Sequence, residues 1–269
     1  METTCYFDIT GKQLIADHLC HKKIDIEGFQ PHTHDTWELI YIKTGSVFYL
    51  VEGRCYTVEG GSCILTRPGV RHTIRFRDPA IYDRYAILLE SPLLDSMPEA
   101  MEVISLGNNP IICDLFQKMD FYAGYLDIDT LERVIGNLSE EALLNFKILS
   151  DQLPEHYTAN TTVTKAIAYI DANLHKQLSL EEMCKYLHIT KSHLHRLFME
   201  HLQLPPAKYV MAKRLHKARM TIRAGCKPTR VFQSCGFGDY CTFYRNYSRQ
   251  FGYPPSEEQD RPNARQIEW

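Results

Sequence analysis

The 269-residue sequence lacks the features that would place the protein outside the cytoplasm. It has no apolar run near the roughly 18 residues that a membrane helix needs. Residues 1–10 contain neither the charged start nor the apolar stretch of a secretory signal. The nine cysteines are odd in number and include no Cys-x-x-Cys pair, which argues against a disulfide framework. We therefore expect a cytoplasmic protein with reduced thiols and no membrane contact.

The chain also lacks a large net charge, because its value of −3 balances two unlike halves. Residues 161–269 hold 17 Lys and Arg against 9 Asp and Glu, whereas residues 1–160 hold 13 against 24. A basic half beside an acidic half favours nucleic-acid binding, since each phosphate contact releases counterions. The length suggests two domains, each large enough to bury a core.

A short pattern occurs twice in the basic half, in residues 178–201 and 228–252. Each copy reads as a short helix, a tight turn and a longer helix, which is the helix-turn-helix arrangement that fits a DNA major groove. In the first copy Ser179 and Glu182 have capping-box spacing. The longer helix has apolar residues at i, i+3 and i+4. Its outward side chains are Lys191, Ser192, His195 and Arg196.

The second copy has Gly236 and Gly238 at its turn, followed by aromatic residues at four-residue intervals. These aromatic residues face inward and leave Tyr240, Cys241, Tyr244 and Arg245 more exposed. A basic helix that starts at Pro205-Pro206 joins the two copies. An ordinary four- or five-helix bundle is the alternative, but two copies joined by one basic helix favour a DNA-binding unit. Phosphate contacts are then expected from Lys213, Arg214, Lys217, Arg223 and Arg230.

These residues resemble the AraC/XylS-type transcriptional regulators, from about Val163 to Pro255. The resemblance rests on Arg214, Leu215, Ala218, Gly236-Phe237, Phe243, Arg245, Phe251-Gly252 and Pro255. It implies that both longer helices read bases, through Ser192, His195 and Arg196 in the first copy and Tyr240, Cys241, Tyr244 and Arg245 in the second. The chain departs from the family at Phe232, where a small Ala is usual, and at 256–259, where an aromatic-Arg pair is usual.

Residues 37–90 read as short strands separated by turn signals, which predicts an antiparallel barrel or sandwich. This part resembles the cupin barrel that precedes the DNA-binding half in many AraC-type regulators. His32, His34, Glu38 and Gly45 fall at the spacing of the first cupin motif, and Pro68-Gly69 with His72 approximates the second.

The set His32, His34, Glu38 and His72 has two interpretations. Three imidazoles and a carboxylate suit a divalent transition metal such as Zn, Fe, Mn or Ni. Alternatively, the same side chains line a pocket for an organic ligand, such as a sugar or organic acid. In either case the barrel interior is the expected effector site, since barrel mouths favour ligand cavities.

Apolar stripes from about Leu93 to Leu153 predict helices, which in this family also serve as a dimer seam. The expected fold is α+β with two domains: an antiparallel cupin-like β-barrel with flanking helices, and an all-α domain with two helix-turn-helix units. The expected boundaries are 1–153 for sensing and dimerisation, 154–161 for a linker, and 162–260 for DNA binding. The tail after Pro254 is expected to be partly disordered.

The favoured function is a ligand-responsive transcription regulator and not an enzyme. Its expected partners are double-stranded DNA, a small-molecule effector, a second copy of the chain and, if it activates, RNA polymerase. A metal-dependent cupin enzyme with a helical appendage is the alternative, based on His32, His34, Glu38 and His72 alone. A third hypothesis is an interaction adaptor that does not bind DNA.

Overall fold

The computed structural model describes residues 2–11, 14–24, 28–78, 80–94, 103–105, 109–150, 158–260 and 267–268. The packing of the chain divides it into two compact units. The first contains Met1–Gln30, Thr36–Leu50 and Cys55–Thr158, and the second contains Pro31–Asp35, Val51–Arg54 and Ala159–Trp269. The expected linker, 154–161, lies partly outside the described residues. The domain boundaries expected from the sequence stay a prediction.

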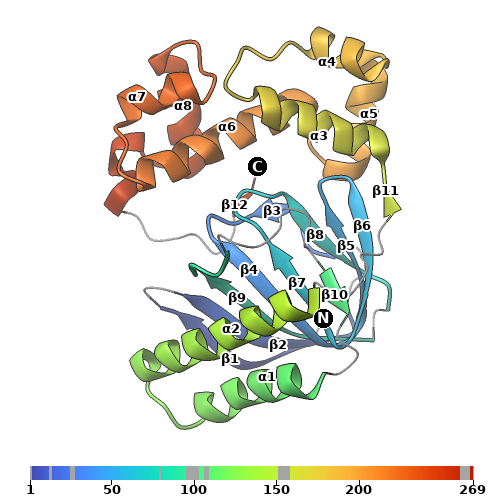
Figure 1. Ribbon diagram of the computed structural model, residues 1–269, viewed down its shortest axis with the longest axis vertical. Helices are drawn as coiled ribbons and strands as arrows, with labels where there is room; N and C mark the ends of the chain where they lie inside the picture. The colour runs from blue at the N-terminus through green and yellow to red at the C-terminus, as the bar shows by residue number, and fades with distance from the viewer. Residues whose placement is uncertain are drawn as a thin grey trace. The chain divides into compact units, whose positions relative to one another are not determined.

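Strands of the described residues form two six-stranded sheets, and the pairs of the first sheet are antiparallel, as expected of a cupin-like barrel (Figure 1). The first sheet has the order β1 (Glu2–Thr10), β2 (Ile15–Lys22), β9 (Ile81–Leu89), β4 (Trp37–Thr44), β7 (Ser62–Thr66) and β10 (Val103–Ser105). The second has the order β11 (Thr158–Ala159), β6 (Arg54–Glu59), β5 (Ser46–Val51), β8 (His72–Phe76), β3 (His32–Thr33) and β12 (Ile267–Glu268).

The central strand β4 of the first sheet has buried side chains on both faces. One face carries Leu39 and Tyr41 of β4, which pair in register with Ile87 and Tyr85 of β9. These side chains pack in one apolar core with two helices, α1 (Pro110–Ala123) and α2 (Ile128–Ser150). Ile40 and Ile42 point to the opposite face because strand residues alternate, and they are buried as well. The strands β1 and β2 precede the segment in which strands were expected from the sequence.

The helix α1 begins where the sequence offers a strong cap. Asn109 Oδ1 accepts hydrogen bonds from the backbone amides of Ile111 and Ile112, at 3.0 and 3.4 Å, and Pro110 occupies the first turn. The buried residues of α1 lie at i, i+3, i+4 and i+7 and face the sheet; they are Ile112, Leu115, Phe116 and Met119.

The helical unit contains two helix-turn-helix pairs joined by one long helix. The first pair is α4 (Leu180–Leu187) and α5 (Lys191–Leu202), preceded by α3 (Thr161–Asn173). The second is α7 (Pro228–Ser234) and α8 (Tyr240–Phe251), followed by the 3₁₀ helix η2 (Pro255–Asp260). Within the described residues, no helix is long and apolar enough to cross a bilayer.

The joining helix α6 (Pro206–Arg223) contributes to two separate cores. Its first half, with Tyr209, Val210 and Ala212, packs into the core of α3, α4 and α5. Its second half, with Leu215, Ala218 and Ile222, packs into the core of α7 and α8.

Candidate DNA-binding surface and barrel site

Local backbone signals position the first helix-turn-helix. Ser179 Oγ accepts the Glu182 amide at 3.4 Å, as the capping-box spacing predicts, and the Ser179 hydroxyl donates to the Glu181 carboxylate at 2.9 Å. His188 ends α4 with a left-handed φ of 54°. Thr190 then starts α5 by accepting the His193 amide at 3.2 Å. The turn is therefore built by a left-handed residue followed two positions later by an N-cap.

The exposed face of α5 carries the predicted base-reading residues. Leu194, Leu197 and Phe198 are buried as expected, which turns the opposite face of the helix to solvent. Arg196 forms an i,i+4 ion pair with Glu200 at 3.6 Å, and Lys191 is paired with Glu181. The exposed residues on this face are Lys191, Ser192, His195 and Arg196.

The turn of the second helix-turn-helix depends on Gly236. This residue has a φ of +82°, and a Cβ there would lie 2.3 Å from the carbonyl oxygen of Leu174. It would also lie 2.8 Å from Arg214 Nε, whose own hydrogen bond goes to the same Leu174 oxygen. A side chain at position 236 therefore cannot be accommodated without moving backbone.

The longer helix of the second helix-turn-helix, α8, presents a partly different surface from the one predicted. Asp239 caps it by accepting the Thr242 amide at 2.7 Å. Cys241, Tyr244 and Arg245 are exposed. Tyr240 is only half-exposed, because its ring lies 5.7 Å from Phe232 and 5.8 Å from Phe243. Tyr240 thus packs against the side chain that replaces the usual Ala.

A buried carboxylate occupies the region where the family usually has an aromatic-Arg pair. Glu258 is fully buried in η2 and accepts hydrogen bonds from Arg219 Nε at 2.8 Å and Arg223 Nε at 2.6 Å. It also accepts from the hydroxyls of Tyr247 and Tyr253. Of the tail after Pro254, which is expected to be partly disordered, Pro255–Asp260 forms η2, and these bonds hold η2 against α6 and α8.

Several Lys and Arg side chains of α6 that were expected to contact phosphates bind acceptors within the second compact unit. Lys213 Nζ lies 3.0 Å from Glu52 and 3.2 Å from Asp171. Arg214 donates to backbone carbonyls at the end of α3, and Arg223 is bound to Glu258. The phosphate contacts of these three residues stay a prediction; their intramolecular acceptors, which the sequence does not reveal, compete with DNA for the same cations.

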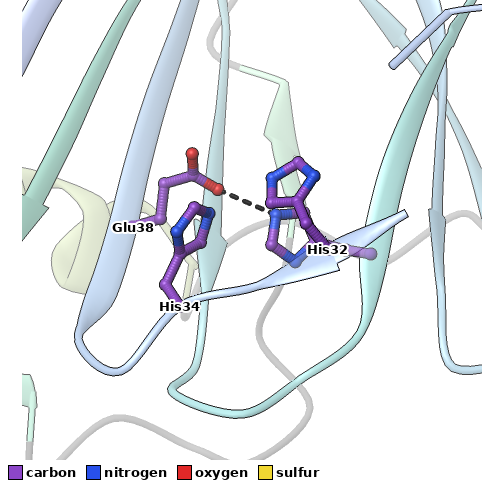
Figure 2. Close-up of side chains that lie close together, drawn as sticks. His32, His34 and Glu38 are labelled. Carbon is purple, nitrogen blue, oxygen red and sulfur yellow. Dashed lines mark ion pairs between the residues drawn. The ribbon is translucent and has the colours of Figure 1, made fainter. Parts of the chain in front are cut away.

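Four side chains converge in the barrel (Figure 2). They come from β3, the residues just after it, β4 and β8, and all four are buried. Each offers one ligand atom, and these atoms lie within 4.8 Å of one another. The sequence motif thus brings together His32, His34, Glu38 and His72.

The hydrogen bonds of His72 define the chemistry of this cluster. Its Nδ1 lies 3.0 Å from the Val70 carbonyl oxygen, which can only accept, so Nδ1 carries a proton. Its Nε2 points at Glu38 Oε2 from 3.1 Å. The rings of His32 and His34 meet edge to face at 4.9 Å. A carboxylate facing several imidazole nitrogens favours a cation, supplied either by a proton or by a metal ion.

A surface hollow of about 490 Å³ lies in the first unit and is not lined by the four cluster residues. Its acidic lining includes Glu132 and Glu140, which accept hydrogen bonds from the Leu14 amide and the Ser91 hydroxyl. These acids therefore have structural roles at the edge of α2.

Two known protein families match the chain. An AraC-like ligand binding domain matches residues 21–119, and a helix-turn-helix domain matches residues 183–261. The HTH-type transcriptional activator RhaS of Salmonella arizonae is 24% identical over 253 residues, covering 85% of this chain and 87% of the relative. The RhaS of Escherichia fergusonii is 25% identical over 244 residues, with the same coverage.

Solved structures are also similar to parts or most of the chain. ToxT from Vibrio cholerae is 11% identical, covers 93% of this chain and 98% of its own, and has a TM-score of 0.40. A transcriptional regulator with an AraC-type DNA-binding domain from Chromobacterium violaceum is 29% identical. It covers 37% of this chain and 89% of its own, with a TM-score of 0.35.

Proposed function

Since this chain belongs to the AraC/XylS family of transcriptional regulators, we propose that it binds specific promoter DNA in response to a small molecule held in its barrel. The observation that carries the proposal is the pair of capped helices, α5 and α8, which expose polar side chains opposite a buried face. Helices of this kind read base edges in the major groove. The metal-dependent enzyme and the adaptor that does not bind DNA are the competing hypotheses.

The base-reading residues of this proposal are Ser192, His195 and Arg196 on α5 and Cys241, Tyr244 and Arg245 on α8. Lys191 and Tyr240 have lesser roles, because Lys191 is paired with Glu181 and Tyr240 packs against Phe232. Arg196 is the strongest candidate. Its ion pair with Glu200 is exposed and worth only about 0.2–0.5 kcal/mol, so DNA can displace it readily.

The test is Arg196→Ala in the full chain, with binding measured on a DNA site selected from random sequence. An Arg that donates two hydrogen bonds to guanine contributes about 1–3 kcal/mol of discrimination, so specific binding should weaken roughly ten- to hundredfold. The melting temperature should stay nearly constant, and Glu200→Gln serves as the matched control. If Arg196→Ala bound the selected site as tightly as the wild type, α5 would not be the helix that reads the bases. If the wild type selected no site at all, the proposed function would be overturned.

We place the effector in the barrel, at His32, His34, Glu38 and His72. Their convergence supports a divalent transition metal as the first occupant, because three imidazoles and one carboxylate form a common donor set. A metal so bound would offer its remaining positions to a hydroxyl or carboxylate of a sugar or organic acid. The Val70 carbonyl would fix the His72 ring through Nδ1 and so leave Nε2 as the nitrogen that binds the metal.

Elemental analysis of protein purified without chelators tests the metal. We expect about one transition-metal ion per chain in the wild type and loss of it in Glu38→Gln. A thermal-shift screen of sugars and organic acids then tests the organic effector separately. If the wild type contains no metal but is still stabilised by such a compound, the metal proposal is wrong and the regulator proposal stands.

A further inference from the structure

A buried histidine outside the barrel cluster has an arrangement that the proposed function does not use. His18 of β2 is fully buried, with Nε2 at 2.7 Å from Asp83 Oδ1 and Nδ1 at 2.6 Å from Asp120 Oδ1. Asp83 belongs to β9 and Asp120 to α1. One imidazole therefore links the sheet to the helix that covers it.

The partners of His18 imply that both ring nitrogens donate. Ionised carboxylates only accept hydrogen bonds, so each nitrogen must carry a proton. The remaining carboxylate oxygens are engaged by cationic or donor groups. Asp83 Oδ2 lies 3.6 Å from Lys43 Nζ, and Asp120 Oδ2 accepts the Tyr85 hydroxyl at 2.6 Å.

The faces of the ring favour the charged form as well. Tyr6 stacks on one face at 4.2 Å between ring centroids and Tyr85 on the other at 3.8 Å, both nearly parallel to it. Aromatic faces attract a cation. The titratable or charged groups around the ring are Tyr6 on β1, Cys20 on β2, Lys43 on β4, Asp83 and Tyr85 on β9, and Asp120 on α1.

The position of Asp120 in α1 favours a positively charged His18 beside it. It lies in the last turn of the helix, where the macrodipole disfavours a carboxylate, and that turn has no basic residue. The next residue, Phe121, is 61% exposed, and its ring lies 5.0 Å from that of Tyr125, which is 77% exposed.

We propose that His18 is a proton-dependent clamp: its imidazolium holds the C-terminal turn of α1, with the exposed aromatic residues beside it, against the sheet. Loss of one ring proton leaves a nitrogen lone pair against a carboxylate and releases that turn. The clamp is a property of the sheet and α1 alone and does not depend on DNA binding.

The direction of the pH dependence follows from the surroundings of His18. Burial lowers the pKa of the imidazole, but hydrogen bonds to Asp120 and Asp83 outweigh this and raise the pKa above its ordinary value of 6.5. The clamp is therefore complete below pH 6.5 and weakens as the pH rises through the raised pKa.

Ring ¹H–¹⁵N spectra of the full chain test the protonation state, with His18 assigned by the signal missing in His18→Gln. We expect both ring nitrogens to be protonated at pH 7, and Asp120→Asn to shift the titration downward by about one pH unit or more. A neutral ring at pH 7, or a titration at or below 6.5, would overturn the clamp.

Hydrogen exchange of α1 amides, corrected for the intrinsic effect of pH, tests the release. In the wild type, protection of the last turn of α1 should fall about tenfold as His18 loses its proton, a change of about 1.4 kcal/mol. Asp120→Asn, whose site is partly exposed, should show low protection at every pH. The matched control is His21→Gln, on the same strand, where the buried ring has no carboxylate partner among its described contacts. Protection of α1 that does not change with pH in the wild type would contradict the proposal.

Discussion

Glu258 illustrates how a single carboxylate can join three elements. Its hydrogen bonds connect η2 with Arg219 and Arg223 of α6 and with Tyr247 of α8. Burial alone would raise the pKa of Glu258, but the hydrogen bonds from Arg219 and Tyr247 lower it, so the group is charged. Arg219 in turn lies 2.8 Å from Asp35 and is almost fully buried. Removing the Glu258 charge would leave the buried guanidinium groups of Arg219 and Arg223 with less opposite charge nearby.

We therefore predict that Glu258→Gln lowers the free energy of unfolding by on the order of 3 kcal/mol. Urea unfolding of the full chain measures the change, and Glu257→Gln, exposed on the same short helix, is the control. Because the pKa of Glu258 is lowered, its stabilisation is present above the ordinary 4.5 and is lost as the pH falls through the folded value. The difference between wild type and variant should accordingly shrink in acid. Equal unfolding midpoints at pH 7 would refute this role.

At the scale of secondary-structure elements, α1 and α2 expose apolar side chains away from the sheet. Leu144 and Ile148 lie one turn apart on α2 and are 45% and 58% exposed. Ile111, Phe121 and Tyr125 of this helical layer are also exposed. Apolar side chains gathered on one layer are typical of protein interfaces. We infer that α2 contributes to a dimer, as the family resemblance implies.

The double variant Leu144→Glu, Ile148→Glu should shift the protein from dimer to monomer, because carboxylates at the centre of an apolar contact lose their hydration. Sedimentation velocity at micromolar concentration measures the mass, and circular dichroism checks the fold. Glu141→Gln is the control on the same helix. A variant that remains as dimeric as the wild type, or a wild type that is monomeric throughout, would exclude this surface.

The elements differ in how far the sequence could predict them. The N-caps Ser179 and Thr190 and the first-turn proline Pro206 are signals that lie in the local sequence. The starts of these helices could therefore be predicted from the sequence. The strand β1 was not predicted, because most of its side chains are exposed and it is held by backbone pairing with β2. A strand that is exposed over most of its length leaves little alternation of apolar and polar residues to read.

The functional sites show the same contrast. His32, His34, Glu38 and His72 could be predicted because the cupin motifs fix their spacing, and the structure brings them together. Glu258 and His18 could not, since a buried charge is recognisable only when its partners are known. The partners of His18 are 65 and 102 residues away along the chain.

Across the whole molecule, the basic excess of residues 161–269 overstates the charge available to DNA. Of 17 Lys and Arg in this half, Lys213, Arg214, Arg219 and Arg223 are bound to acidic groups or carbonyls of the same unit. Arg230 is among those that remain exposed. Phosphate contacts must therefore come from fewer residues than the composition suggests.

This limits the salt dependence of DNA binding. Each neutralised phosphate lowers log K by about 0.9 per decade of salt, so the slope counts the cations that reach DNA. Fluorescence anisotropy on random duplex between low and moderate salt measures it. Arg230→Gln should reduce the slope by about one phosphate, whereas Arg214→Gln should reduce stability and leave the slope unchanged. If Arg214→Gln reduced the slope by a whole phosphate, the Arg214 side chain would have left the carbonyls at the end of α3 to contact DNA. An affinity that does not depend on salt would refute nucleic-acid binding.

The two cores that share α6 have a consequence for the geometry of the target site. The helix α6 is continuous between Ala212 in the first core and Leu215 in the second. Each residue inserted between them would therefore rotate the second core by about 100° and move it by about 1.5 Å relative to the first. One inserted residue would therefore rotate α8 away from the side on which the proposed function has both α5 and α8 meet DNA, while four would nearly restore the rotation at a longer spacing. Under the proposed function, the length of α6 sets the distance between the two DNA segments that α5 and α8 contact.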